Sequence, residues 1–314
     1  MEQKKLTRLD PREYEHPLDQ KALDALAGTP GLETFVKKFH QYGIERILKI
    51  QFTGSNLKVN QKNFPDLHRT LQQVCEILYL ANTPDLYIQS SGEINALTAG
   101  VEKPIIVINS GCVDMLTQTE LMFVLGHEVG HIKSQHVLYH QMAALLPILG
   151  DVVDAATLGL GGLVAVGIEM ALINWQRKSE FTADRAGLLA CQDVAAATSA
   201  LVKIAGLPQK YFNSFNVQDF ITQAMEFEGY DLDKLGKVAK VLSLAGQPHP
   251  WTVMRAAEFF KWTESGEYEK ILNRETSLAD ATPQAVQANF CAKCGTKLKG
   301  NEAFCPTCGN KIQA

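Results

Sequence analysis

The segment FVLGHEVGHIKSQH, from Phe123 to His136, most constrains how this chain can fold. It places His127 and His131 four residues apart, with Glu128 directly after the first histidine. In a helix, side chains four residues apart project from one face about one turn apart, so both imidazoles can reach one zinc ion. Glu128 would lie beside that ion without having to bind it. This H-E-x-x-H pattern predicts a metal-binding helix with a carboxylate placed as a general base.

The start and the interior of this helix carry signals of their own. Thr117 and Glu120 form a T-x-x-E capping box, which predicts that the helix begins near Thr117. Gly126 and Gly130 are unfavourable in a helix interior. We therefore expect another segment of the chain to approach the helix closely at these two glycines.

A catalytic zinc site needs a third protein ligand and an open coordination position. Some zinc sites take a third histidine from H-E-x-x-H-x-x-G-x-x-H, but Ser134 stands at that glycine position and His136 follows His131 by five residues. At about 100° per residue, His136 would point well away from the face that carries His127. For His136 and His140 we therefore expect a surface position, or a role in supporting the ligands, and no bond to zinc.

The alternative third ligand is a glutamate from a later helix. The segment WQRKSEFTADRAGLLA, residues 175–190, offers Glu180 with Asp184 one turn further along the same face. Glu180 can complete the metal site, and Asp184 can hydrogen-bond a ligand histidine and so hold its tautomer. An E-x-x-x-D pair alone is typical of a solvated helix face, so its meaning depends on the H-E-x-x-H motif.

Four stretches in order carry a resemblance to a known family. They are INALTAG (94–100), HEVGHIKSQH, EFTADRAG and HPWTVMR (249–255). Together they resemble the zinc peptidases of the HtpX-type heat-shock and CAAX prenyl endopeptidase family, over about residues 60–260. The resemblance implies an α+β, mainly helical gluzincin metallopeptidase domain with a small β-sheet against the zinc helix. Many members are membrane-embedded with several spans, and this chain is more similar to the soluble branch.

The resemblance also implies roles for individual residues. His127, His131 and Glu180 would bind the catalytic zinc. Glu128 would be the base that activates the attacking water, as the H-E-x-x-H pattern by itself suggests.

Four further residues would line or support this site. The resemblance implies that Asn95, on the strand beside the cleft, contacts the substrate backbone and that His249 helps to stabilise the transition state. Asp184 and Arg255 would be structural supports. From the residues alone, Asn95 can also be a turn-forming asparagine and His249 a loop histidine before a proline.

The remaining pattern predicts further helices and a few short strands. We expect helices at 31–44, 65–80, 176–206, 217–244 and 253–262, a β-hairpin at 45–59, and strands at 85–89, 94–100 and 104–110.

Residues 142–175 are the least polar part of the chain. The longest uncharged stretch in their second half, 155–168, has 14 residues, fewer than the 18 or so that a transmembrane helix needs. We expect a helical hairpin packed on the domain, with membrane association as the alternative. The polar N-terminus has no apolar segment typical of a secretory signal, so we expect a cytoplasmic location.

Four of the seven cysteines lie near the C-terminus, in FCAKCGTKLKGNEAFCPTCGNKI (290–312). Four thiolates can surround one Zn²⁺ tetrahedrally, so this pattern predicts a zinc ribbon, with disulfides or an iron site as alternatives. The expected ligands are Cys291, Cys294, Cys305 and Cys308. The expected organisation is a metallopeptidase domain at 1–273, a linker at 274–289 and the ribbon at 290–314.

These features together predict a zinc-dependent endopeptidase with one catalytic and one structural zinc ion. Its partners would be protein or peptide substrates, with a possible place in protein quality control. The alternative is a non-catalytic zinc-binding adaptor that recognises proteins through the ribbon. The net charge of −4 argues against general nucleic-acid binding.

Overall fold

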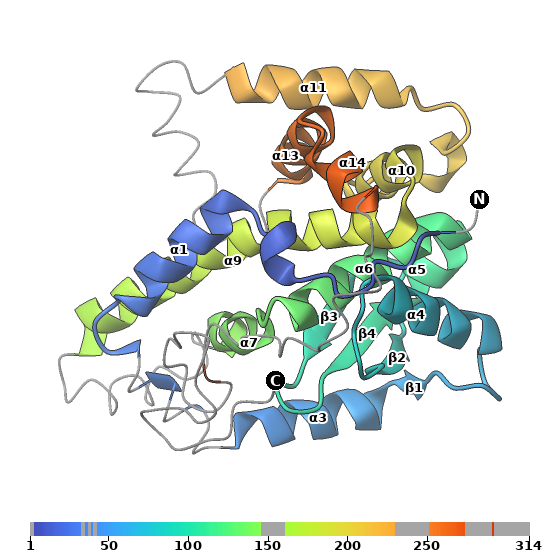
Figure 1. The fold of residues 1–314 in the computed structure, drawn as a ribbon. Coiled ribbons are helices and arrows are strands. Elements are labelled where there is room, and N and C mark those ends of the chain that lie inside the picture. The colour runs from blue at the N-terminus through green and yellow to red at the C-terminus, as the bar shows by residue number, and fades with distance from the viewer. Residues whose placement is uncertain are drawn as a thin grey trace, which may run out of the picture.

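The computed structural model describes residues 3–32, 35, 36, 39, 43–145, 161–229, 251–273 and 291 of the 314-residue chain. Within these residues the architecture is mainly helical with one four-stranded sheet, which confirms the expected α+β class (Figure 1). Its elements are η1 (Pro11–Glu13), α1 (Pro17–Ala27), α3 (Ile44–Ser55), β1 (Leu57–Lys58), α4 (Pro65–Ile77), β2 (Asp85–Gln89), β3 (Ala96–Ala99), β4 (Ile105–Asn109), α5 (Ser110–Met115), α6 (Gln118–Lys133), α7 (Val137–Leu145), α9 (Gly161–Cys191), α10 (Val194–Ile204), η2 (Gln209–Tyr211), α11 (Val217–Gly229), α13 (Thr252–Glu264) and α14 (Glu267–Leu272).

The sheet has the strand order β1-β2-β4-β3. β2 and β4 are parallel, and β3 pairs antiparallel with β4, so β3 lies at one edge. β4 has the sequence IIVIN, with its first four residues buried, as a strand covered on both faces requires. The three strands predicted from the sequence are therefore confirmed, with slightly shorter bounds for β3 and β4.

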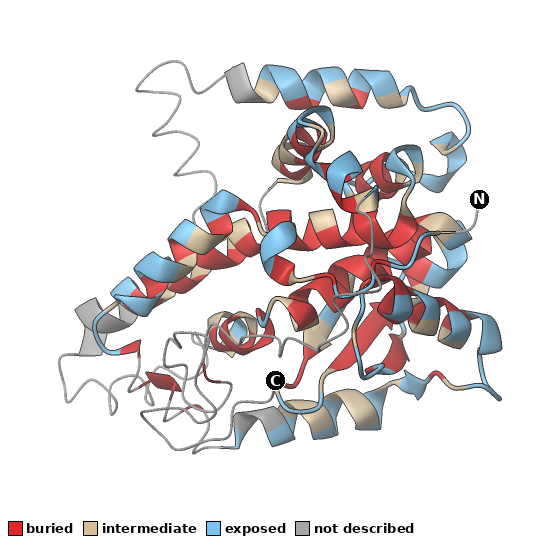
Figure 2. Cartoon of the chain, in the orientation of Figure 1, coloured by how far each residue is buried: buried red, intermediate tan, exposed pale blue. Residues whose placement is uncertain are grey.

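The contact between α6 and α9 forms the centre of the molecule. Figure 1 shows α6 between the sheet and α9, and Figure 2 shows both helices largely buried. A Cβ atom on Gly126 would collide with Ala190, and one on Gly187 would lie 2.8 Å from the carbonyl oxygen of Phe123. Small residues thus let the two helices approach closely, as expected from Gly126. The capping box of Thr117 and the start of α6 are also confirmed.

The predicted β-hairpin at 45–59 is wrong. Residues 44–55 form α3, and only Leu57 and Lys58 pair with β2. Phe52 of α3 packs against a small buried cluster of the sheet, made of Tyr87, Ala99, Ile105 and Val107. A short apolar pattern such as ERILKIQF fits a strand or a helix, and this packing against the sheet decides for the helix.

The predictions for 142–175 and for the helix at 176–206 need revision. α9 continues without a break from Gly161 to Cys191, and Gln192, with φ of 53°, separates it from α10. α7 packs against α9, but residues 146–160, where a hairpin turn would lie, are outside the described residues. None of the described helices combines the length and the apolar composition needed to cross a membrane.

Other predictions are tested only in part. The helices at 65–80 and 253–262 correspond to α4 and α13, and α11 covers the start of the helix predicted at 217–244. Of the helix at 31–44, only a few residues are described, among them the buried Phe35 and Phe39. The linker at 274–289 lies outside the described residues, as does the ribbon except for Cys291, which is buried.

Candidate active site

The two neighbouring helices bring three possible metal ligands together. His127 and His131 project from α6, and Glu180 projects from α9; all three are buried. The Nε2 atoms of His127 and His131 are 3.1 Å apart. Oε2 of Glu180 lies 3.5 Å from Nε2 of His127, and Oε1 lies 3.4 Å from Nε2 of His131.

These distances fit a tetrahedral zinc ion. Ligand atoms about 2.0–2.1 Å from one ion in tetrahedral geometry lie roughly 3.3 Å from each other. The two Nε2 atoms are 3.1 Å apart, and each has one carboxylate oxygen of Glu180 at 3.4 or 3.5 Å, close to that value. Two imidazole nitrogens and one carboxylate are also a ligand set that catalytic zinc uses. The three residues that the sequence singled out therefore meet in an arrangement that can hold the ion.

An ion pair fixes the far side of His127. Its Nδ1 lies 3.0 Å from Oδ1 of Asp184, and Arg255 donates two hydrogen bonds to Asp184, of 2.6 and 2.8 Å. Burial raises the pKa of the Asp184 carboxyl. The charge and hydrogen bonds of Arg255 outweigh this effect and keep that pKa below its usual value. Burial also disfavours the charged form of His127, yet hydrogen bonds to Asp184 and Glu180 raise its pKa to about 9.

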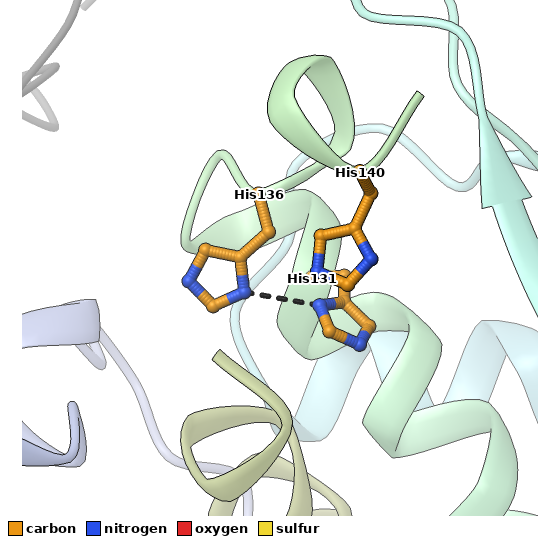
Figure 3. Close-up of side chains that lie close together, drawn as sticks. All are labelled: His131, His136 and His140. Carbon is orange, nitrogen blue, oxygen red and sulfur yellow. Dashed lines mark hydrogen bonds between the residues drawn. The ribbon is translucent and has the colours of Figure 1, made fainter. Parts of the chain in front are cut away.

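His131 has a different environment. Its Nδ1 lies 3.0 Å from Nδ1 of His136. Figure 3 draws this contact as a dashed line between the two rings. Burial is the main reason that the pKa of His131 falls to about 4, and the charge of His127 lowers it further.

The expectation that His136 points away from the ligand face is wrong. α6 ends at Lys133, and Gln135 adopts a left-handed conformation with φ of 59°. The N–H of His136 then bonds to the carbonyl of His131 at 2.9 Å, the pattern of a Schellman motif. This turn brings His136 back over the last turn of the helix, so its helical phase no longer applies. His136 is buried and supports a predicted ligand, one of the two roles that the sequence left open.

His140 lies close to the same group. Its ring centroid is 4.6 Å from that of His131, and its Nε2 lies 2.7 Å from the hydroxyl of Ser179. His131, His136 and His140 present nitrogen atoms within 4.8 Å of one another (Figure 3). These contacts place His140, which lies on α7, beside the possible ligand His131.

Glu128 lies beside the three possible ligands and is held by a strand. The hydroxyl of Thr98, on β3, donates a hydrogen bond of 2.7 Å to Oε2 of Glu128. Glu128 also lines a cavity of about 980 Å³ together with the three possible ligands. Residues 95–99 form part of the wall of this cavity, so the edge strand and the carboxylate face one space.

Asn95 lies at the exposed end of β3. Its side-chain oxygen accepts a hydrogen bond from the N–H of Ala96, and its carbonyl accepts one from the N–H of Asn109. Asn95 lines the cavity, although none of these bonds joins it to the possible ligands. His249 lies outside the described residues, as do Cys294, Cys305 and Cys308.

Sequence reasoning missed Thr98 and Asp19. Thr98 occupies an ordinary strand position in INALTAG, and no short pattern connects it with Glu128, 30 residues away. Asp19 lies on α1 and contacts Nε2 of His136 at 3.2 Å, across 117 residues of sequence. Gln141, buried on α7 at the cavity wall, was also not identified. A single sequence holds no local signal for such distant contacts.

Comparison with known proteins agrees with this geometry. The family described as "Peptidase family M48" matches residues 61–263. The plastoglobule-localized metallopeptidase 48, chloroplastic, of Arabidopsis thaliana is 33% identical over 268 residues, covering 85% of this chain and 76% of that protein. Protease HtpX homolog 2 of Methanosarcina acetivorans is 26% identical over 53% of this chain and 64% of its own length. The Protease HtpX homolog of Ralstonia pickettii is 26% identical, over 67% and 78% respectively.

No solved structure matches the chain. The family match extends over nearly the same residues, 60–260, as the resemblance seen in the sequence. Metallopeptidases of this family hydrolyse peptide bonds, so the chain is a hydrolase with protein or peptide substrates. The chain belongs to peptidase family M48.

Proposed function

We propose that this protein is a zinc-dependent endopeptidase in which His127, His131 and Glu180 bind the metal and Glu128 is the general base. The observation that carries the proposal is the meeting of these three ligands at separations of 3.1 to 3.5 Å, with Glu128 on the same cavity wall. A bound zinc ion would supply a Lewis acid that polarises the peptide carbonyl and makes water more acidic.

The residues of the chain supply the proton transfers. Glu128 takes a proton from the attacking water and delivers it to the nitrogen of the leaving amine. The hydroxyl of Thr98 keeps this carboxylate turned toward the cavity, where both transfers occur. Asp184 and Arg255 hold His127 from behind, so that its Nε2 stays directed at the metal position.

The substrate would bind as an extended chain along β3. This strand ends the order β1-β2-β4-β3, so its outer edge is not paired with another strand of the described sheet. Main-chain hydrogen bonds to an edge strand do not depend on the substrate's side chains, which suits a peptidase that accepts several sequences. Asn95, at the start of β3, is placed to contact the substrate backbone, and His249 remains our candidate for stabilising the transition state.

Further parts of the proposal rest on the sequence alone. We expect the four cysteines of 290–314 to bind a second, structural zinc ion, and the chain to act in protein quality control in the cytoplasm. The adaptor alternative is disfavoured because a non-catalytic protein would not need the base Glu128. Our test is cleavage of an unfolded protein substrate with and without a zinc chelator.

We expect the chelator to abolish cleavage and added zinc to restore it. Glu180→Gln removes a charged ligand, so zinc content and cleavage should fall together. Cleavage that survives complete removal of zinc would contradict the metal-dependent mechanism. A Glu180→Gln variant with full zinc content would show that the ligand set is wrong.

A further inference from the structure

We propose that Asp19 and His136 are positioning residues for the metal ligand His131, and that the N-terminal segment thereby forms part of the metal centre. The proposal rests on the function proposed above, because it takes His131 as a zinc ligand. It adds a second support to the metal site, separate from the Asp184–Arg255 pair behind His127.

The contacts form one continuous chain. Nδ1 of His131 lies 3.0 Å from Nδ1 of His136, and Nε2 of His136 lies 3.2 Å from Oδ2 of Asp19. The hydroxyl of Thr182 donates a hydrogen bond of 2.6 Å to the same oxygen, and the N–H of His16 donates one of 3.0 Å to Thr182. His131, His136, Asp19 and Thr182 are all buried, so water does not compete strongly for these bonds.

The direction of these hydrogen bonds follows from the chemistry of imidazole. A neutral histidine that binds a metal through Nε2 carries its proton on Nδ1. His131 must therefore donate from Nδ1, and the atom that it meets, Nδ1 of His136, must accept. A neutral His136 then carries its own proton on Nε2, where the carboxylate of Asp19 accepts it. Each contact has one donor and one acceptor, with none left mismatched.

The chain of contacts performs the task that a single carboxylate performs for His127. Ligand histidines commonly donate their second nitrogen to a carboxylate or carbonyl, which fixes the ring and makes it a stronger ligand. His127 reaches Asp184 directly at 3.0 Å, whereas His131 reaches Asp19 through the ring of His136. The Schellman turn after α6 places the ring of His136 between His131 and Asp19.

Asp19 comes from outside the part of the chain that matches the family. The match covers residues 61–263, whereas Asp19 lies on α1, which packs along α9 (Figure 1). A pair formed by His16 and Glu258, 2.9 Å apart, joins the start of α1 to α13. The N-terminal segment is thus attached to the two helices that carry Glu180 and Arg255.

The cluster in Figure 3 allows one other interpretation, a second metal ion held by His131, His136 and His140. That ion would require both nitrogens of His131 to bind metal at once, with no proton on the ring. The hydrogen-bonded chain leaves the proton on Nδ1 of His131, and we favour it for this reason.

The test is zinc affinity of the full-length protein, measured as zinc content across a series of buffered free-zinc concentrations. For His136→Ala and Asp19→Ala, the concentration that half-fills the histidine site should rise about 10–100-fold. Asp19→Asn retains an acceptor oxygen, so the half-filling zinc concentration should rise less than in Asp19→Ala. The matched control is Asp24→Ala, an exposed carboxylate on the same helix, which should leave it unchanged. Thermal unfolding of each metal-free variant reports whether the fold is retained.

The double variant His136→Ala/Asp19→Ala gives the sharpest outcome. Both residues act through one chain of contacts. The half-filling zinc concentration of the double variant should therefore rise about as much as that of the more affected single variant, and not by the product of the two single fold-changes. Independent, multiplicative effects would overturn the proposal, as would wild-type affinity in His136→Ala. If the wild-type protein at saturating zinc binds one more ion than His136→Ala does, the second-metal interpretation replaces the positioning proposal. A failure of the proposed ligand set would instead appear as unchanged zinc content in Glu180→Gln, which leaves Asp19 and His136 intact.

Discussion

His127 and His131 share one face of α6, yet their second nitrogens meet different partners. His127 contacts a charged pair, Asp184 with Arg255, whereas His131 contacts the ring of His136. Burial lowers the pKa of His131 to about 4, whereas for His127 the hydrogen bonds to Asp184 and Glu180 outweigh burial and raise the pKa to about 9. Two histidines on one helix face therefore have different surroundings. The proposed base Glu128 has a third environment, in which the hydroxyl of Thr98 donates a hydrogen bond to it.

At this scale we predict that Glu128→Gln separates catalysis from metal binding. The amide keeps the shape of the side chain but cannot accept the proton, so cleavage of an unfolded protein should fall about 10²–10⁴-fold. Zinc content, measured by elemental analysis, should stay at the wild-type level because Glu128 does not bind the ion. Glu180→Gln is the matched control, since it should lose both. Cleavage near the wild-type rate in Glu128→Gln would assign the base elsewhere.

Among the helices and strands, the close packing of α6 against α9 sets the geometry of the site. The proposed ligands come from both helices, so their separation depends on how near the two helix axes lie. Gly126 and Gly130 permit that approach, because a Cβ atom at either position would meet Ala190 or Ala186. Two glycines, which have poor helix propensity, thus shape the proposed metal site by allowing close packing.

We predict that Gly126→Ala destabilises the protein although alanine favours helices. The added methyl group would collide with Ala190, and such overpacking typically costs about 1–3 kcal/mol. Gly54→Ala, on the exposed surface of α3 with no atom within 4 Å of the new Cβ, should instead stabilise it by about 0.4–1 kcal/mol. Urea unfolding of the two variants measures the difference. Equal effects in both would mean that the helices can separate freely.

A second prediction concerns the contact between His16, at the start of α1, and Glu258 on α13. The hydrogen bond from His16 is the main cause that lowers the pKa of Glu258 from 4.5 to about 2. A lowered carboxyl pKa stabilises the fold above pH 4.5, and this stability is lost as the pH falls toward 2. Glu258→Gln should therefore lower the free energy of unfolding at pH 7 by on the order of 1–3 kcal/mol.

The pH series supplies the control for that prediction. The difference between wild type and Glu258→Gln should shrink as the pH falls below about 4, because the wild-type carboxyl then becomes neutral too. Glu264→Gln, an exposed position on the same helix, should change stability by less than about 0.5 kcal/mol at any pH. A Glu258→Gln effect that stays constant down to pH 2 would point to lost packing instead.

The whole chain combines a family core with segments at both ends. The family match covers 61–263, whereas Asp19 lies before it and the four clustered cysteines after it. The N-terminal segment reaches His136 and Thr182, next to the proposed metal site, through buried contacts of Asp19. Cys291 is buried within the described residues, and the zinc ribbon stays a prediction from cysteine spacing.

For the whole molecule we predict two bound zinc ions in chemically different sites. Elemental analysis of the purified protein should give about two ions per chain, one from the His/His/Glu set and one from the cysteines. Replacing Cys294 and Cys305 by serine in the full chain should remove one ion, and Glu180→Gln should lower occupancy of the other. A zinc count that the cysteine replacements do not change would reject the ribbon.

The sequence by itself determined the features that depend on near neighbours. The spacing of His127, Glu128 and His131 and the capping box at Thr117 are set within a few turns of one helix. Strands 85–89 and 104–110 follow from runs of apolar residues. Periodicity and capping act over a few residues, so the chain alone carries this information. The E-x-x-x-D spacing offered Glu180 and Asp184, and the family resemblance then added Arg255 to the set.

Which distant side chains meet depends on how the elements pack together. The helix of α3 in place of a hairpin depends on packing of Phe52 against the sheet, and the position of His136 depends on a turn beyond the helix end. The contact of His136 with Asp19 joins residues 117 positions apart. Burial against partners far along the chain stabilises these arrangements, and no local pattern in one sequence encodes such partners.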